Sequence, residues 1–405
     1  MYTRMMAQLT LGLVLLSSVG RTARAETYEY LVTDLGTLGG PTSSATGLNE
    51  SGQIVGLSTV ADANYHAAFW DLGAVDLGTV GVDSQSMANC VNDAGHVVGV
   101  SYNYGELQAH AFEWLEGVLT PLGDFSPHGI NAAGIIVGHQ TQLTGGGLLV
   151  NHAAQWSGGV LADLGTLGGS YSEAYAVDSA GRIVGQSFLP DDVTVRACLW
   201  IGGVPRDLGS LMGTPGGDSS AADINDFGQI AGWTETEAGF HHACLFQVDA
   251  GGSVTARTDL GVLGDDFSYA YGINAAGVVV GCSGSRAFRW RQGVLEDLNA
   301  LIPSGAGWTL SRASGLNDSG VIVGEGVRFG FQRAVMLTPV SCLKGDVSGD
   351  GAVDGLDVQP FLDAVSGSAT PRAICAGDVA DVGDGIVSLA DLSNFVSCLL
   401  AGGCE

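Results

Sequence analysis

The sequence has little positive charge. Its 405 residues contain 15 Lys and Arg against 42 Asp and Glu, a formal net charge of −27, and Lys344 is the single lysine. A surface that binds phosphate must be basic, so this balance excludes nucleic acid and anionic membranes as partners. Prolines are few, at 10, and charged residues make up 14%, whereas glycines number 64. This composition is typical of short strands and tight turns, not of helices or a disordered acidic tail.

Long apolar runs are also missing after the first residues, so we expect no membrane span, which would need about 20 such residues. Residues 1–25 have the pattern of a secretory signal peptide. Arg4 gives a positive start, residues 5–19 are mostly apolar, and Ala23 and Ala25 are the small residues of a cleavage point. We therefore predict a secreted, extracellular or cell-surface protein whose mature chain begins near Glu26.

One phrase, Asn-x-x-Gly-x-(Ile/Val)-(Val/Ala)-Gly, occurs seven times. The copies start 43, 39, 47, 47, 49 and 43 residues apart, at Asn49, Asn92, Asn131, Asp178, Asn225, Asn274 and Asn317. A period in this range indicates a repeat architecture, in which each unit buries its apolar face against its neighbours.

Two further motifs accompany the phrase. The first is a strand-like pentad such as HAAFW, which starts at His66, His110, His152, Arg196, His242, Arg286 and Arg333. Its second residue is always Ala, which predicts close contact between sheets, whereas its variable fourth residue is predicted to be unconstrained. The second motif is Asp-Leu-Gly or a variant, at Asp34, Asp76, Pro121, Asp163, Asp207, Asp259 and Asp297. These motifs resemble the HAF family of extracellular repeats over residues 28–339, a resemblance that implies no particular chemistry.

The sixth unit predicts four short antiparallel strands, at residues 268–273, 278–282, 286–290 and 294–298, with a turn at 274–277. Four such strands form one blade of a β-propeller. The seventh unit lacks a fourth strand, and one Asp-Leu-Gly precedes the first unit, so residues 28–35 should complete the last blade. We predict an all-β, seven-bladed propeller over residues 26–340. The links between second and third strands, and those between blades, vary in length and should share the functional face.

From Lys344 the chain becomes acidic and glycine-rich. The residues that fall on the ligand positions of a calcium loop are Asp346, Ser348, Asp350, Ala352 through its carbonyl, Asp354 and Asp357, with Gly351 at the sharp turn. A second copy supplies Asp384, Ile386, Ser388 and Asp391, with either Asp378 or Asp381 as its first ligand. We predict two calcium sites, the second distorted.

Apolar residues at helical spacing follow the first loop, so residues 341–405 are predicted to form a small helical domain. The two half-hands resemble a type I dockerin, which implies calcium-dependent docking onto a cohesin-type partner. Gly355-Leu356 and Leu389-Ala390 stand where dockerins often carry Ser-Thr, so the partner's identity stays open.

The eight cysteines fall into two groups. Cys198 and Cys244 occupy equivalent pentad positions, too far apart for a bridge, and are predicted to be small buried residues. The last four, Cys342, Cys375, Cys398 and Cys404, are predicted to form disulfides; Cys342–Cys375 with Cys398–Cys404 is one of three pairings.

No catalytic set stands out. The pentad histidines alternate with arginines, which cannot bind zinc, so a structural hydrogen bond is favoured. The acidic pairs Asp191-Asp192, Asp265-Asp266 and Glu235/Glu237 lie in predicted loops. We predict a non-catalytic binding or adhesion protein for a polysaccharide or cell-surface ligand. There are two alternatives. One is a secreted carbohydrate-active enzyme (a glycoside hydrolase or lyase) that carries a dockerin, and the other is a structural cell-envelope component.

Overall fold

The computed structural model describes residues 29–103, 109–143, 146–212 and 216–340, together with Val358, Phe361, Leu362 and Val396. The chain divides into two units, and Tyr30–Pro339 is the larger one. The predicted signal peptide, both calcium loops and the last four cysteines lie outside the described residues. Within the described residues, no helix is long and apolar enough to cross a membrane.

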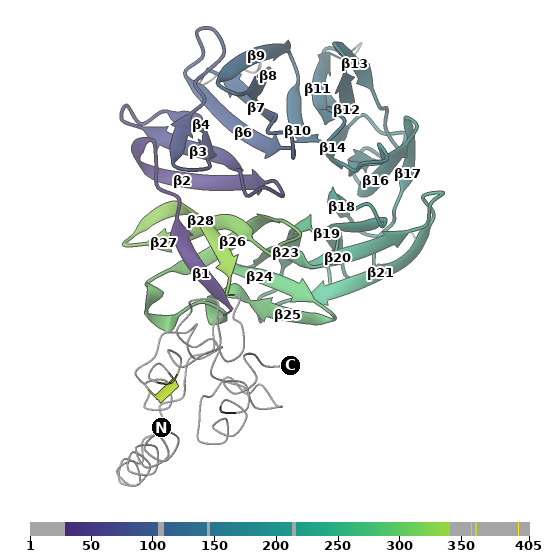
Figure 1. Ribbon diagram of the computed structural model, residues 1–405. Coiled ribbons are helices and arrows are strands. Elements are labelled where there is room, and N and C mark those ends of the chain that lie inside the picture. Colours follow the sequence, from purple (N-terminus) through teal and green to yellow (C-terminus); the bar gives the residue numbers. More distant parts are fainter. Residues whose placement is uncertain are drawn as a thin grey trace. The chain divides into compact units, whose positions relative to one another are not determined.

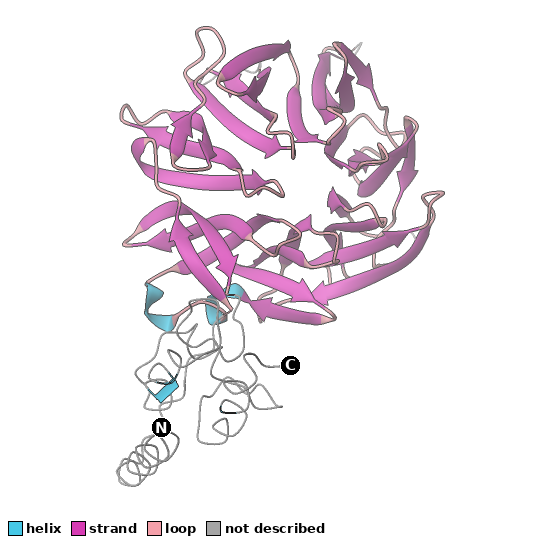
Figure 2. Ribbon diagram, viewed as in Figure 1, coloured by secondary structure: helices cyan, strands magenta, loops and turns pink. Residues whose placement is uncertain are grey.

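Seven antiparallel sheets of four strands surround a central axis (Figure 1), and nearly all the described chain is strand or connecting loop (Figure 2). Blades one to three are β2 (Gly39–Leu48), β3 (Ile54–Val60), β4 (Tyr65–Trp70) and β5 (Ala74–Asp76); β6 (Gln85–Val91), β7 (Val97–Tyr102), β8 (His110–Leu115) and β9 (Val118–Gly123); and β10 (Ser126–Ile130), β11 (Ile136–Leu143), β12 (Leu149–Ser157) and β13 (Val160–Asp163).

Blades four to seven are β14 (Ser172–Val177), β15 (Ile183–Phe188), β16 (Val195–Ile201) and β17 (Val204–Asp207); β18 (Ser219–Ile224), β19 (Gln229–Glu235), β20 (His241–Val248) and β21 (Val254–Gly261); β22 (Ser268–Ile273), β23 (Val279–Ser283), β24 (Arg286–Arg291) and β25 (Val294–Asp297); and β26 (Thr309–Leu316), β27 (Ile322–Arg328), β28 (Phe331–Pro339) and β1 (Tyr30–Asp34). Two short 3₁₀ turns, η2 (Leu298–Ala300) and η3 (Ser304–Ala306), join blades six and seven. The predicted seven-bladed propeller is confirmed.

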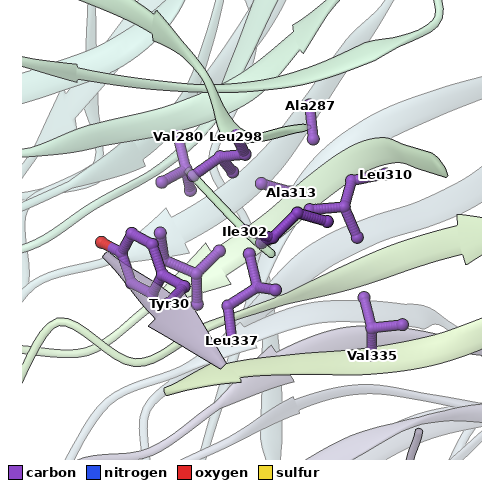
Figure 3. Packing of buried hydrophobic residues seen from close by; sticks show 10 residues of the cluster. Tyr30, Val280, Ala287, Leu298, Ile302, Leu310, Ala313, Val335 and Leu337 are labelled. Carbon is purple, nitrogen blue, oxygen red and sulfur yellow. The ribbon is translucent and has the colours of Figure 1, made fainter. Parts of the chain in front are cut away.

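The ring closes as predicted, because β1 is the outer strand of blade seven. It pairs antiparallel with β28, with Tyr30 opposite Pro339 and Asp34 opposite Val335. Tyr30 is buried in a cluster that also contains Ile302 and Leu337 (Figure 3). Its hydroxyl accepts a hydrogen bond from Arg289 Nη1 of blade six at 3.0 Å. The N-terminal strand therefore fastens two blades, and no blade is left with an unpaired fourth-strand position.

The two faces of a pentad strand pack against the two neighbouring blades. In blade one, Ala67 and Phe69 pack towards blade two, whereas Ala68 and Trp70 pack towards blade seven. The alanine at the second position is fully buried, as expected for close contact. The prediction that the fourth position is unconstrained is wrong: Leu199 is fully buried there, because a blade enclosed on both sides has no solvent-facing side.

A glycine in the second strand of every blade lies opposite a β-bulge in the first strand. In blade four, the register shifts between Ala174 and Ala176, directly opposite Gly185. A Cβ on Gly185 would clash with the carbonyl oxygen of Glu173. The same clash would arise at Gly56, Gly99, Gly138, Gly232, Gly281 and Gly324. The absence of a side chain at this glycine makes room for the bulge.

In six blades the charged pentad residue pairs with the aspartate of Asp-Leu-Gly in the same blade; in blade two, where Pro121 replaces that aspartate, His110 Nδ1 pairs with Asp83 at 2.9 Å. His66 Nδ1 lies 2.9 Å from Asp76, and Arg196 Nε lies 3.7 Å from Asp207. Histidine makes a hydrogen bond to this carboxylate and arginine an ion pair with it, so the two residue types replace one another among the repeats. Arg333 and Asp34, at 3.9 Å, make the equivalent pair across the closure of the ring. The structural role predicted for the pentad histidines is confirmed.

The four cysteines of the propeller, Cys90, Cys198, Cys244 and Cys282, are free thiols. Cys198 and Cys244 are fully buried, as predicted. Burial raises the pKa of the Cys244 thiol to about 12, so it packs as a neutral, small apolar group.

Candidate functional site

The first strands of all seven blades surround a central channel with two mouths. We call the end formed by the turns between first and second strands the turn mouth, and the opposite end the loop mouth. A cavity of about 300 Å³ lies at the turn mouth and one of about 560 Å³ lies towards the loop mouth, and both are lined by residues of every blade. The links predicted to share one face open onto the loop mouth. In blades six and seven the link between the second and third strands is a two-residue hairpin.

At the turn mouth the repeat asparagines form a closed ring of hydrogen bonds. The carboxamide oxygen of each caps its own turn, as Asn131 Oδ1 accepts from the N–H groups of Ala133 and Ile135. The carboxamide nitrogen donates to the backbone carbonyl of the equivalent residue in the next blade. These donations run from Asn49 to Asn92, Asn92 to Asn131, Asn131 to Asp178, Asn225 to Asn274, Asn274 to Asn317 and Asn317 to Asn49, at 2.9–3.3 Å.

Blade four completes the ring by different chemistry. Asp178 stands in place of the asparagine, and a carboxylate cannot donate. Arg182, four residues later, pairs with the Asp178 carboxylate and extends its Nη2 to the carbonyls of Asn225 and Asp226, at 3.5 and 3.0 Å. The arginine thereby supplies the missing donor. All side chains of this ring are engaged with the backbone, so the turn mouth is a structural fastening.

The N–H groups of four residues that follow ring members add a second layer of contacts. Glu50 N–H donates to Asp93, Ser179 N–H to Asp226 and Ala275 N–H to Asp318. The N–H of Asp318 donates to the carboxylate of Glu50 across the closure of the ring. Burial raises the pKa of Glu50, and the N–H of Asp318 opposes that rise.

Towards the loop mouth, the bulges place one variable side chain per blade in the channel. The bulged residue has no partner in the second strand, and in every blade its side chain lines the larger cavity. The seven residues are Thr46, Asn89, His128, Tyr175, Ala222, Tyr271 and Ser314. Bulges commonly re-aim side chains beside functional sites. This set stands three residues before each repeat asparagine, a position that sequence reasoning did not single out.

A polar cluster between blades three and four reaches the loop-mouth cavity through His128 and Tyr175. His128 Nε2 lies 3.1 Å from His139 Nδ1, which lies 3.5 Å from Glu173 Oε1. Tyr175 donates its hydroxyl proton to Glu173 Oε2 at 2.7 Å, and Asn151 donates to Oε1 at 3.1 Å. Burial, and secondarily the neighbouring His139, lowers the pKa of His128 to about 4, so this imidazole is neutral at neutral pH.

The part of the cavity wall formed by blades five to seven is rich in aromatic residues. Trp233 stacks on His241 with ring centroids 4.3 Å apart, and Tyr269 meets both rings edge-on. Beside them, the Arg312 guanidinium lies 3.9 Å from the centre of the Tyr271 ring. Trp233, Tyr269, Tyr271 and Arg312 all line the cavity. Flat rings flanked by hydrogen-bonding groups give the cavity both stacking faces and polar anchors.

The acidic residues singled out in the sequence stabilise loops instead. Asp191 accepts from the N–H groups of Val193 and Thr194 and from the Thr194 hydroxyl, and these hydrogen bonds lower its pKa to about 2. Asp192 accepts from the N–H of Ser170. Within the described part of the chain, neither these two nor Asp265, Asp266, Glu235 and Glu237 line the loop-mouth cavity. The structure does not bring them together.

Asp265 and Glu235 likewise have structural contacts. Asp265 pairs with Arg286 Nη2 at 2.8 Å, and Glu235 accepts from the N–H of Asp218 at 3.0 Å. The predicted calcium ligands, from Asp346 to Asp391, lie outside the described residues.

No family model matches the chain, and no curated protein matches it. Several solved structures are similar in fold. They include a catalytically inactive virginiamycin B lyase from Staphylococcus aureus with quinupristin, at 11% identity over 76% of this chain and 99% of that chain, with a TM-score of 0.47. The WD40 β-propeller domain of Doa1 has 14% identity over 75% and 96%, with a TM-score of 0.41. A gluconolactonase from Xanthomonas campestris has 13% identity over 80% and 99%, with a TM-score of 0.36.

At these identities the likeness is one of fold alone. The chain is a seven-bladed β-propeller by its own strand order. Fold alone assigns it no activity.

Proposed function

We propose that this protein is a secreted, non-catalytic binding protein that takes a polysaccharide segment or cell-surface glycan into the loop mouth of its channel. The observation that carries the proposal is the set of bulged residues. In each blade one glycine and one bulge direct a side chain into the cavity, and those side chains differ from blade to blade. An invariant scaffold that carries varied side chains is the arrangement of a recognition site.

The chemistry of the cavity suits a neutral sugar. Trp233 and Tyr271 offer flat apolar faces on which a sugar ring can stack, and Asn89, Gln186 and Ser314 offer donors and acceptors for hydroxyl groups. A net charge of −27 disfavours an anionic ligand. A cavity of about 560 Å³ has room for a short oligosaccharide segment, since ligand sites commonly span roughly 300–1,000 Å³.

The C-terminal segment would tether the protein. Its acidic loops, with Asp346, Ser348, Asp350, Ala352, Asp354 and Asp357 in the first, carry oxygen ligands at the spacing that calcium requires. We infer a small calcium-dependent domain that docks onto a cohesin-type partner or a matrix. A pull-down from host secretions in calcium, repeated in EDTA, tests this part: a partner retained equally in both would contradict it.

The ring is tested on the full chain against immobilised neutral polysaccharides and an array of oligosaccharides. Trp233→Ala and Tyr271→Ala should each reduce binding at least about tenfold, because each removes a stacking face. Phe227→Ala is the matched control, since Phe227 is an exposed aromatic residue of the same blade as Trp233 but lies at the turn mouth.

Binding that is lost in Phe227→Ala and kept in Trp233→Ala would move the site to the other mouth. Repeated absence of binding would favour a structural envelope component. Release of shortened saccharides would favour a carbohydrate-active enzyme, for which the acidic pairs of the loops offer no assembled pair of catalytic carboxylates.

A further inference from the structure

The cluster of His128, His139 and Glu173 brings three lone-pair donors to one point. His128 is the bulged residue of blade three, His139 follows the glycine opposite that bulge, and Glu173 lies on the first strand of blade four. One ligand atom from each residue lies within 4.8 Å of those from the other two. The bulge and its glycine thus assemble the cluster at the boundary between two blades.

Hydrogen bonding alone satisfies this cluster poorly. A neutral imidazole carries one N–H, so the 3.1 Å contact between the two rings holds a single proton. If that proton belongs to His128, the lone pair of His139 Nδ1 faces the Glu173 carboxylate 3.5 Å away. If the proton is on His139 Nδ1, His139 can donate it either to His128 Nε2 or to Glu173 Oε1, and the other acceptor receives no hydrogen bond. A cation at the centre would satisfy all three atoms at once.

The spacing suits a transition-metal ion. Zinc bound to nitrogen at about 2.0–2.1 Å in a tetrahedron sets its ligand atoms roughly 3.3 Å apart. The two separations from His139 Nδ1, 3.1 Å to His128 Nε2 and 3.5 Å to Glu173 Oε1, bracket that value, and the third pair of ligand atoms lies within 4.8 Å. Two histidines and one carboxylate form a known zinc ligand set that leaves a fourth position open. His128 and Tyr175 line the loop-mouth cavity, so the open position would face the channel.

The surroundings of Glu173 also match those of a metal ligand. Its Oε2 accepts from Tyr175 at 2.7 Å and its Oε1 accepts from Asn151 at 3.1 Å, so its orientation is fixed before any ion arrives. Outer partners of this kind orient the ligands of protein metal sites and raise metal affinity. Tyr175 serves this role while being the bulged residue of blade four, and it packs edge-on against His128 at 5.5 Å.

We infer that His128, His139 and Glu173 form a zinc-type divalent metal site in the channel wall, with its open position available to water or to a hydroxyl oxygen of a bound ligand. A metal site goes beyond the proposed binding function, and metal binding is measured without any saccharide. The same donor set accepts other ions of the series, so zinc and cobalt are the probes used in the test.

The test is a zinc titration of the full chain, stripped with chelator, in competition with a chromophoric chelator. Wild-type protein should bind one zinc ion that His139→Gln and Glu173→Gln lose, with affinity lowered more than about 100-fold. Tyr175→Phe, which keeps all three ligands and removes only the outer hydrogen bond, should lose about 10–100-fold. His152→Gln is the matched control, since His152 belongs to the same blade and pairs with Asp163 away from the cluster.

Cobalt separates this site from the chain's cysteines. Bound at His128, His139 and Glu173, it should show visible ligand-field bands without sulfur-to-metal charge transfer, and these bands should vanish in His139→Gln. If His139→Gln does not fold, as judged by circular dichroism, Tyr175→Phe decides. Three results would overturn the assignment. They are equal zinc affinity in wild type, His139→Gln and Tyr175→Phe, absence of zinc binding in the wild type, and a thiolate spectrum that survives in His139→Gln.

Discussion

The two mouths of the channel are built from the same strands and behave oppositely. At the turn mouth six of seven blades present the same side chain, an asparagine, and each is hydrogen-bonded to its own turn and to the next blade. At the loop mouth the seven bulged residues are threonine, asparagine, histidine, two tyrosines, alanine and serine. The repeated residues therefore hold the ring together, whereas the residues that differ among repeats line the larger cavity.

The largest effect is expected from removing the strand that closes the ring. Deleting residues 30–34 leaves blade seven without its outer strand and removes Tyr30 from the core between blades six and seven. Calorimetry should show the loss of the cooperative unfolding transition, because an edge is opened and several buried contacts disappear together. Leu31→Ala, at a half-exposed position of the same strand, should melt close to wild type. A deleted protein that melts as before would mean that β1 does not close the ring.

The next effect separates the bulge from the general fold. Gly185→Ala should destabilise the protein by about 3 kcal/mol, because its Cβ would clash with the Glu173 carbonyl and force the bulge to move. Gly73→Ala, where an added Cβ meets open space, is the control and should be near neutral. Urea unfolding measures both. If the two variants unfold at the same urea concentration, the bulges do not depend on these glycines.

A smaller effect is expected within the asparagine ring. Asn131→Asp keeps the oxygen that caps the turn and removes the donor to the Asp178 carbonyl, so it should cost about 1–3 kcal/mol. Ser179→Ala, an exposed neighbour whose backbone N–H makes the ring contact, should cost almost nothing. Thermal denaturation compares the two. Equal melting temperatures would show that the ring adds no stability.

The last effect concerns the pH dependence of stability. Burial raises the pKa of Asp223, between blades five and six, from 3.8 to about 6, while its carboxylate accepts from the N–H of Ile273 at 2.9 Å. A raised carboxyl pKa means that the folded state holds the proton more tightly than the unfolded state. This group's contribution is therefore most favourable below about pH 4, declines between pH 4 and 6, and stays unfavourable above pH 6.

Asp223→Asn should remove this decline, which amounts to at most about 3 kcal/mol for a shift of about two units. The measurement is the free energy of unfolding at pH 4 and pH 7 for both proteins. A decline of the same size in the variant would assign it to other groups.

Much of this architecture could be predicted from the sequence, because the constant residues make the same local contacts in each repeat. Three features were enough to predict seven blades and their closure: the period of the asparagines, the turn glycines, and the Asp-Leu-Gly at Asp34 that precedes the first repeat unit. The pairing of His66 with Asp76 was anticipated only as a structural hydrogen bond. Its partner lies on an adjacent strand, and that register follows from the fold.

The cavity residues could not be found in the same way. His128 and His139 are separated by a turn, and Glu173 belongs to the following blade, so only the bulge register brings their ligand atoms together. The signal that was available is the variable position three residues before each repeat asparagine. A search for repeated residues passes over that position, because its value to the site lies in differing from blade to blade.

The division between the two mouths is tested most directly by measuring stability and saccharide binding in the same two variants. Asn131→Asp should lower the melting temperature and, at a temperature where it remains folded, bind an array-identified oligosaccharide as tightly as wild type. Trp233→Ala should keep the larger part of the wild-type melting temperature and lose that binding. If Trp233→Ala binds like wild type, or if folded Asn131→Asp loses the ligand, the loop mouth is not a separate recognition site.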